Sequence, residues 1–341
     1  MPVPERTLPP GLRLRYRFEW MLLRTAEAVV PRLPLGLVRF GARVLGTLVW
    51  MGDVKGRHVI RENLRLALGD THDRAELRRL ERENYRLFAR TFLELFWGSR
   101  LKAEDWDRYF TVTFDSPRAE AAATSGKCIF ATAHFGNFEW LSLGRALRFG
   151  ASMIIAQDFK NPPLTTLFHR LRSRGGQIII SQEGAMLKLF RHLKRGGTVA
   201  ALVDLNTPPD QSATVIRRFG MWSSISVLHV ALAARTGAPV VPALALARDD
   251  GRWELRFLDP VPVSADTPLQ EAAQQCWDAI EPILRRHPGQ WMWLYKHWRF
   301  LPPGCDPSDY PSYANPSARF RRLFATEAPN IKTPPPPPEV G

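Results

Sequence analysis

The sequence predicts an α/β protein with a mixed, mostly parallel sheet flanked by helices and an N-terminal amphipathic helical module. Two observations lead to this prediction. Beyond residue 105, short apolar runs alternate with helical segments of about 10 to 15 residues, a pattern typical of parallel sheets covered on both faces. Before that point, apolar residues recur at helical spacing and arginines occupy the other faces.

Residues 1–105 are expected to form the helical module and to dock on a membrane. Up to Asp70 the chain has twelve Lys or Arg residues against six Asp or Glu, which suits an anionic lipid surface. The longest apolar stretch is broken by Arg39 and Arg43, so a helix lying in the interface is favoured over a spanning one, with a short insertion as the alternative. Thr71-His72-Asp73 is expected to cap the last helix. Helices are predicted at residues 14–30, 33–51, 57–68 and 74–99.

Residues 106–302 are expected to form the α/β domain. Strands are predicted at residues 109–114, 127–133, 151–157, 177–180, 198–203, 214–219, 240–247 and 253–258. Helices are predicted between them at residues 116–125, 137–149, 164–174, 183–194, 223–235 and 269–286. The remaining residues, 303–341, are rich in Pro, Arg and Ser and include five consecutive prolines, so they are predicted to be a disordered or polyproline II tail.

Composition narrows the classes of function. The formal net charge of +14, with eleven Trp and nineteen Phe, favours a headgroup interface, and the absence of a recognisable binding motif makes nucleic acid an unfavoured partner. The three cysteines are widely spaced, which argues against a disulfide framework or a zinc site. The chain has neither a Gly-x-Ser-x-Gly elbow nor a P-loop, which argues against a serine hydrolase and an NTPase.

The segment from His134 to Glu139 (HFGNFE) follows a predicted buried strand and opens a helix, a place where α/β sheets bind ligands. Gly136 permits a tight turn, and Asn137 is a good N-cap. The turn is expected to fold His134 back towards Glu139, whose carboxylate would fix the tautomer of the imidazole and raise its basicity. The simpler alternative is a polar residue that ends a strand, followed by an ordinary first-turn acid.

Such a pair can perform acyl transfer. The free nitrogen of His134 would take a proton from an alcohol that attacks an acyl thioester, and backbone N–H groups around Gly136 would stabilise the oxyanion. Two groups of arginines are candidates for binding phosphate, with a solvated surface as the alternative. They are Arg170, Arg172 and Arg174, and Arg217 with Arg218.

Several motifs occur in a recognisable order: residues 61–64 (RENL), 134–139, 193–200 (LKRGGTVA), 234–242 (ARTGAPVVP) and 288–293 (PGQWMW). Over roughly residues 15–300 the chain resembles the lipid A biosynthesis lauroyl/myristoyl acyltransferases of the lysophospholipid acyltransferase superfamily, which share an H-x4-D/E motif. The resemblance implies that His134 is the general base and Glu139 its partner, and that neither a metal nor an organic cofactor is needed. It also implies a donor that is an acyl carrier protein thioester or acyl-CoA, and an acceptor hydroxyl on a glycolipid or lysolipid.

The resemblance further implies a site on the cytoplasmic face of a bacterial inner membrane. Asp204, after a predicted strand, matches a second acidic position that orients the acceptor or shapes the site; the alternative is a simple turn cap. Apolar residues near the site are expected to line an acyl channel whose depth sets chain length, namely Phe135, Phe138 and Trp140. The residues expected to contact substrate are Gly136, Asn137, Arg174, Asp204 and Arg218.

Three segments depart from the family pattern: residues 205–209 (LNTPP), residues 181–183 (SQE), and Tyr295-Lys296. All three lie in elements that the resemblance assigns to the acceptor, so the acceptor is left open. A glycerolipid, an ornithine lipid and a phosphoglycolipid are the alternatives to a lipid A precursor. A non-catalytic membrane-lipid-binding protein with the same fold is the alternative from another class.

Overall fold

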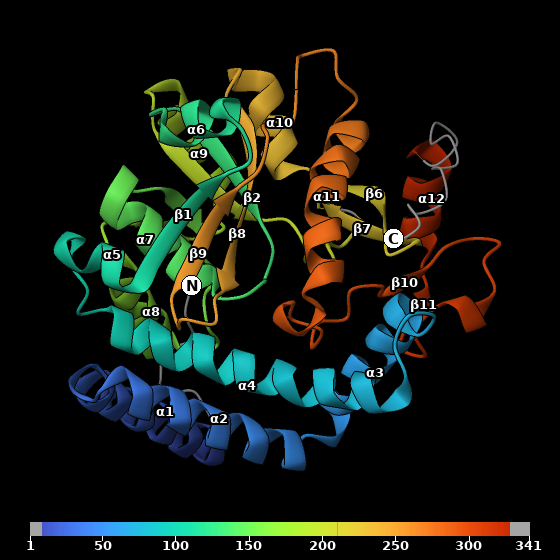
Figure 1. Cartoon of the computed structure of the whole chain (residues 1–341). Helices are drawn as coiled ribbons and strands as arrows, with labels where there is room; N and C mark the ends of the chain where they lie inside the picture. Colours follow the sequence, from blue (N-terminus) through green and yellow to red (C-terminus); the bar gives the residue numbers. More distant parts are fainter. Residues whose placement is uncertain (1–8, 210, 328–341) are drawn as a thin grey trace.

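The computed structural model describes residues 9–209 and 211–327. The predicted N-terminal helices are all present: α1 (Pro10–Val29), α2 (Leu35–Gly52), α3 (Val54–Leu68) and α4 (Arg74–Gly98), with the short turn η2 (Val30–Arg32) between the first two. In Figure 1, α1 and α2 lie on one side of α4, and the α/β body lies on the other. The long helix α4 therefore joins the N-terminal helices to the sheet.

Local chemistry explains where α4 begins and how α2 packs on it. Asp73 caps α4 by accepting hydrogen bonds from the backbone N–H groups of Ala75 (2.7 Å) and Glu76 (2.8 Å), and the Glu76 carboxylate accepts from the Asp73 N–H (2.9 Å). Gly46 of α2 faces α4 so closely that a Cβ there would lie 2.6 Å from the Arg86 Cα. A glycine at this position lets the two helices approach.

The central sheet has seven strands in the order β1-β9-β8-β2-β5-β3-β4. All neighbours run parallel except β8 and β9, which are antiparallel, so the predicted mixed and mostly parallel sheet is confirmed. The strands are β1 (Phe110–Phe114), β2 (Cys128–Thr132), β3 (Met153–Ile155), β4 (Ile178–Ile180), β5 (Thr198–Leu202), β8 (Val240–Ala247) and β9 (Trp253–Phe257).

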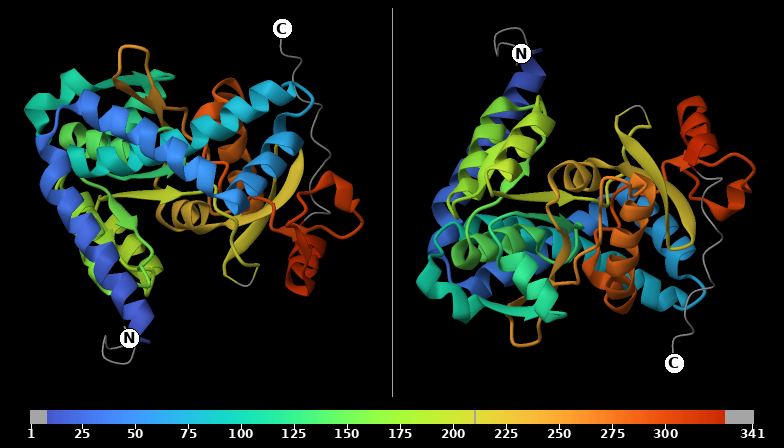
Figure 2. Two further views of the ribbon diagram at one scale, coloured as in Figure 1. Left: turned by 90° about the horizontal axis from the view of Figure 1, so that it is seen from below. Right: turned by 90° about the horizontal axis from the view of Figure 1, so that it is seen from above.

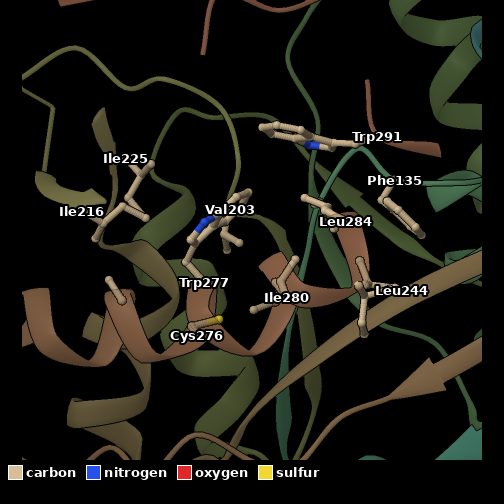
Figure 3. Close-up of a cluster of buried hydrophobic side chains, with 14 of the residues drawn as sticks. Phe135, Val203, Ile216, Ile225, Leu244, Cys276, Trp277, Ile280, Leu284 and Trp291 are labelled. Atoms are coloured by element: carbon tan, nitrogen blue, oxygen red, sulfur yellow. The ribbon is translucent and has the colours of Figure 1, made fainter. Parts of the chain in front are cut away.

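Helices cover both faces of the sheet and create two cores. Along β2, Ile129 and Ala131 pack into one core and Cys128 and Phe130 into the other, as the alternation of side chains along a strand requires. The first core includes α11 side chains around Trp277, drawn in Figure 3. The covering helices are α6 (Pro117–Thr124), α7 (Phe138–Phe149), α8 (Pro162–Ser173), α9 (Ala185–Lys194), α10 (Leu228–Thr236) and α11 (Leu269–Arg286).

A hairpin replaces the start of the helix that was predicted at residues 223–235. Strand β6 (Ala213–Arg218) pairs antiparallel with β7 (Met221–Ser226), and α10 begins only at Leu228. The two turn residues, Phe219 and Gly220, both have positive φ angles of 50° and 82°, which matches the twist of a two-residue hairpin. The prediction was wrong here because the apolar residues of β7 also fit a helical spacing.

Residues 303–327 form a folded segment, contrary to the predicted tail. It contains η5 (Pro307–Asp309), the strand β11 (Asn315–Pro316) paired with β10 (Phe300–Leu301), and α12 (Ala318–Glu327). Tyr310, Tyr313 and Phe320 are buried and anchor it, although the Pro-rich average composition hides these aromatic residues. The five consecutive prolines lie outside the described residues.

The outer sides of α1 and α2 carry exposed apolar side chains, among them Leu14, Phe18, Phe40 and Leu48, each at least 60% exposed. Seen from below in Figure 2 (left), the two helices form a V in front of the rest of the chain. Within residues 9–209 and 211–327, α2 alone is long and apolar enough to cross a membrane, and 17% of it is buried in the protein. Buried core helices of soluble proteins can have the same length and apolar composition.

Candidate active site

His134 lies two residues beyond the end of β2, where the chain turns into α7. Asp204 lies two residues beyond the end of β5, which is the parallel neighbour of β2. The Asp204 carboxylate holds His134 twice: Oδ2 accepts from the His134 backbone N–H at 2.8 Å, and Oδ1 lies 2.8 Å from the ring Nδ1. Two adjacent strands thus bring together residues that are far apart in the sequence.

The contact with Asp204 sets the tautomer of His134. An ionised carboxylate only accepts hydrogen bonds, so Nδ1 of the ring carries the proton that it shares with Asp204. The lone pair is then on Nε2, the nitrogen that can accept a proton from a substrate. His134 lines a cavity at this edge of the sheet, which places a base at a cavity wall.

The surroundings of Asp204 keep it ionised although it is fully buried. Burial alone would raise the pKa of Asp204, but the neighbouring His134 and the hydrogen bond from the Trp291 indole N–H (2.9 Å) hold this pKa well below its usual range. The Asp204 carbonyl accepts a hydrogen bond from Arg218 at 2.6 Å. Asp204 is therefore a fixed negative charge behind the imidazole at neutral pH.

Glu139 has a different partner from the one that the sequence predicted. Its carboxylate accepts from Arg172 of α8, through Nη2 at 2.6 Å and Nε at 3.1 Å, whereas the carboxylate on the His134 ring belongs to Asp204. The expected contact between Glu139 and His134 is corrected accordingly. The reason is geometric: α7 begins at Phe138, and its first turn directs Glu139 towards α8, while the end of β5 lies directly beside the end of β2.

Gly136 and Asn137 build the turn, and neither lines the cavity. Gly136 has a φ angle of 54°, and its N–H donates to the Gln290 carbonyl at 2.7 Å. The Asn137 side chain accepts from the Trp140 N–H (3.0 Å) and donates to Glu94 (2.7 Å). The expectation that these two residues contact substrate is therefore not supported, and the Gly136 N–H is not available as an oxyanion donor.

Replacing Gly136 with alanine is expected to lower the free energy of unfolding by about 3 kcal/mol or more. An added Cβ would lie 1.7 Å from the Ala245 carbonyl oxygen, and the φ angle itself disfavours a side chain. Gly184 is the matched control, because it has a similar φ angle of 63° but open space around its Cβ position. Its alanine variant should lose about 1 kcal/mol in urea unfolding; equal losses at both positions would contradict the steric explanation.

A buried acid on α4 ties the turn to the helical module. Glu94, which is fully buried, accepts from Arg39 of α2 (2.6 Å) and from Arg90 (2.9 Å). It also accepts from Asn137 (2.7 Å) and the Trp253 indole N–H (3.0 Å). The spacing of Arg90 and Glu94 on a helix was a local signal for an ion pair, but no pattern in the sequence indicated that Glu94 contacts the turn before α7.

The cavity beside His134 has a volume of about 680 Å³. Glu139, Arg172 and Tyr295 line it together with His134, and most of its remaining wall is apolar. The apolar wall includes Phe92, Phe130, Phe138, Ile154, Ala200 and Phe257. A cavity of this volume, with polar residues beside His134 and an otherwise mostly apolar wall, suits a fatty acyl chain.

Only one of the three aromatic residues predicted to line the channel does so. Phe138 lines the cavity, whereas Phe135 and Trp140 are fully buried in the cores and do not reach it. Trp140 donates its indole N–H to the Glu94 carbonyl at 2.7 Å. The prediction was wrong for these two because residues close to His134 in sequence alternate between the cavity and the two cores.

The predicted phosphate-binding arginines also separate. Arg172 lines the cavity, but Arg174 donates to the Ser99 hydroxyl (3.0 Å) and, with Arg170, to Glu27 of α1. Arg218 is fully buried and donates to the carbonyls of Asp204 and His297, both at 2.6 Å. The structure therefore gives Arg174 and Arg218 internal partners in place of the expected substrate.

Two aromatic residues complete the site without having been predicted as parts of it. The Tyr295 ring lies 4.9 Å from the His134 ring, and burial, Asp204 and Glu139 raise the pKa of Tyr295 to about 12, so it is a neutral phenol. Trp291 is buried, and its indole N–H donates to Asp204. Tyr295 stood out in the sequence only as a departure from the family pattern.

Comparison with known proteins agrees with this architecture. No curated protein matches the sequence. The model of the family described as bacterial lipid A biosynthesis acyltransferase matches residues 9–300, which include the helical module, the sheet and every residue of the site. The chain therefore belongs to the bacterial lipid A biosynthesis acyltransferases, a membrane-associated family of enzymes that transfer an acyl chain from a donor to a lipid acceptor.

Proposed function

We propose that the protein transfers a fatty acyl chain from an acyl carrier protein or CoA thioester to a hydroxyl of a lipid A-type glycolipid precursor. His134 is the general base, and Asp204, in place of Glu139, is the carboxylate that orients it. The observation that carries this proposal is the 2.8 Å contact between Asp204 Oδ1 and His134 Nδ1, at the wall of an apolar cavity. The exposed apolar sides of α1 and α2 support docking on the cytoplasmic face of the inner membrane.

The reaction follows from the tautomer of His134. Nε2 takes the proton of the acceptor hydroxyl while that oxygen attacks the carbonyl carbon of the thioester. The tetrahedral intermediate collapses, the carbon–sulfur bond breaks, and the imidazolium returns the proton to the departing thiolate. Asp204 stabilises the imidazolium between these two steps without accepting a proton itself.

The oxyanion needs a positive environment, and the start of α7 supplies one. Phe138 and Glu139 of its first turn line the cavity, so the positive end of the helix dipole faces the reacting group. Arg172 lies at the same wall, where its two-pronged contact with Glu139 holds the guanidinium in place. We assign Arg172 to a phosphate of the glycolipid or of the phosphopantetheine arm of the donor.

The apolar part of the cavity is the proposed acyl channel. Ala200 on β5 lies directly beside Phe130 on β2. Each of these two residues comes two positions before the end of its strand, and the catalytic pair follows those strand ends. Both residues line the cavity. An acyl chain whose thioester lies at His134 is therefore expected to pass Ala200 inside the cavity. This makes Ala200 a suitable position for testing the channel.

Replacing Ala200 with phenylalanine is expected to shorten the preferred acyl chain. The larger side chain would fill the inner part of the channel, so kcat/KM for the longest natural donor should fall about tenfold or more, while a shorter donor should be affected less. Turnover of a series of acyl thioesters of increasing length measures the preference. A uniform loss for all chain lengths would contradict the placement of the chain at Ala200.

Replacing His134 with alanine tests the base directly. Acyl transfer should fall by about 10³-fold or more, since a well-placed base and its orienting acid act as one unit, while binding to vesicles should be unchanged. The measurement is turnover of a radiolabelled or mass-tagged thioester with a lipid A precursor. Retained turnover would exclude His134 as the base, and mass spectrometry of lipids from a deletion strain would name the acceptor.

A further inference from the structure

A second depression, of about 570 Å³, lies at the turn between α1 and α2. Its lining shares no residue with the cavity beside His134. In Figure 2 (left) this turn is the point of the V that the two helices form. Its wall carries four arginines, which come from η2, from α2, from the turn after α4 and from α5 (Trp106–Tyr109). They are Arg32, Arg39, Arg100 and Arg108.

The positive charge of this depression is largely unbalanced. Across residues 9–209 and 211–327, no carboxylate pairs with Arg32, Arg100 or Arg108. Arg32 and Arg100 donate to the backbone carbonyls of Ala28 and Pro31, and Arg108 lies 5.4 Å from the centre of the Tyr109 ring. Three guanidinium groups therefore have donors left for an anion.

Arg39 adds a buried donor that has no partner. Its Nε donates to Glu94 at 2.6 Å, but its Nη2 is buried and makes no hydrogen bond within the described chain. A buried N–H group without an acceptor is rare and costs free energy. Arg39 is one of the residues that line the depression, so its unsatisfied donor is a second observation in favour of a ligand there.

The surrounding groups organise the site for an anion. The guanidinium of Arg100 lies 5.2 Å from the centre of the Trp97 ring, which in turn meets the Tyr109 ring edge-on at 5.2 Å, so the cations rest on a rigid aromatic support. Helix α2 begins here at Leu35 without a side-chain cap. The positive end of its dipole therefore points into the same depression.

A neighbouring depression shows what a balanced site looks like. It has a volume of about 510 Å³ and is lined by Arg24, Arg32 and Arg174 together with Glu27. The Glu27 carboxylate already pairs with Arg24 and Arg174. No carboxylate lines the depression at the α1–α2 turn, although Arg32 borders both depressions.

We propose that the depression at the α1–α2 turn binds the phosphate of an anionic membrane lipid. Arginines bind phosphate oxygens through paired N–H groups, which suits a cluster of guanidinium groups. The lipid source is favoured over free phosphate because exposed apolar side chains adjoin the site: Val29 (46% exposed), Leu37 (51%) and Phe40 (62%). These side chains offer a place for acyl chains, which inorganic phosphate does not need.

Vesicle binding of the full-length His134→Ala protein tests the proposal independently of turnover. Its affinity is compared for phosphatidylglycerol–phosphatidylcholine vesicles and for pure phosphatidylcholine vesicles. Arg100→Glu and Arg108→Glu should each weaken binding to the anionic vesicles about twentyfold, since each reverses one charge near the surface. Gly36→Glu should also weaken binding to the anionic vesicles. This variant is expected to fold, because a Cβ at position 36 meets no atom within 4 Å and an acidic side chain stabilises the first turn of a helix.

Arg118→Glu is the matched control, because Arg118 is exposed on α6, at the opposite end of the molecule from α1 and α2 in Figure 1. It should change the affinity less than about twofold. An equal loss in Arg118→Glu and Arg100→Glu would show a diffuse positive field and overturn the site. Calorimetry with inorganic phosphate distinguishes the two sources of phosphate. If Arg100→Glu abolished phosphate binding but left the affinity for anionic vesicles unchanged, the lipid assignment would be overturned.

Discussion

Replacing Asp204 with asparagine is expected to lower kcat by about 10³- to 10⁴-fold. The amide has nearly the same shape, but it carries no negative charge and can donate to Nδ1, which would leave the proton on Nε2. The ring of His134 would then have the wrong tautomer for accepting a proton from the acceptor hydroxyl. Steady-state turnover at saturating donor and acceptor measures the loss.

The control for this experiment is Glu139→Gln. Because Glu139 holds Arg172 and does not contact the imidazole in the structure, its amide variant should raise KM more than it lowers kcat. Thermal unfolding of both variants checks that the fold is kept, since Asp204 also accepts from the His134 backbone and Trp291. A larger kcat loss for Glu139→Gln than for Asp204→Asn would show that the two carboxylates have been assigned the wrong roles.

Replacing Glu94 with glutamine is expected to lower the free energy of unfolding by about 3 to 5 kcal/mol. The carboxylate is fully buried between Arg39 and Arg90, and removing its charge leaves two guanidinium groups without compensation. The Asn137 cap and the Trp253 indole N–H depend on the same carboxylate. Urea unfolding, with the wild-type protein measured in parallel, gives the difference.

Glu104→Gln is the matched control for this stability measurement. Its side chain is 75% exposed and lies 3.6 Å from Lys102, so its amide variant should remain within about 0.5 kcal/mol of the wild type. A change of less than about 1 kcal/mol for Glu94→Gln would contradict the view that this buried network holds the helical module to the turn before α7.

The sequence supported the location of the site but not the identity of the orienting carboxylate. A buried strand followed by Gly136 and Asn137 indicated a turn into a helix, and His134 lies at that turn. The contact with Asp204 depends on β2 and β5 being neighbours in the sheet, which no local pattern of residues reveals. Sequence reasoning therefore favoured Glu139, the acid nearest along the chain.

The other differences have similar physical causes. The hairpin of β6 and β7 depends on positive φ angles at Phe219 and Gly220, which residue type alone indicates for the glycine but not for the phenylalanine. The order in the segment up to Glu327 depends on a few buried aromatic residues, such as Phe320, within a Pro-rich composition. Arg218 is fully buried, whereas adjacent basic residues such as Arg217 and Arg218 usually indicate an exposed surface.

The most direct measurement of the central claim is a double-mutant cycle of kcat/KM that combines His134→Ala with Asp204→Asn. If Asp204 acts only through the imidazole, the double variant should transfer acyl chains no more slowly than His134→Ala alone, because residues that act as a unit are strongly non-additive. Losses that multiply in the double variant would show that Asp204 acts independently of His134 and would contradict the proposed pair.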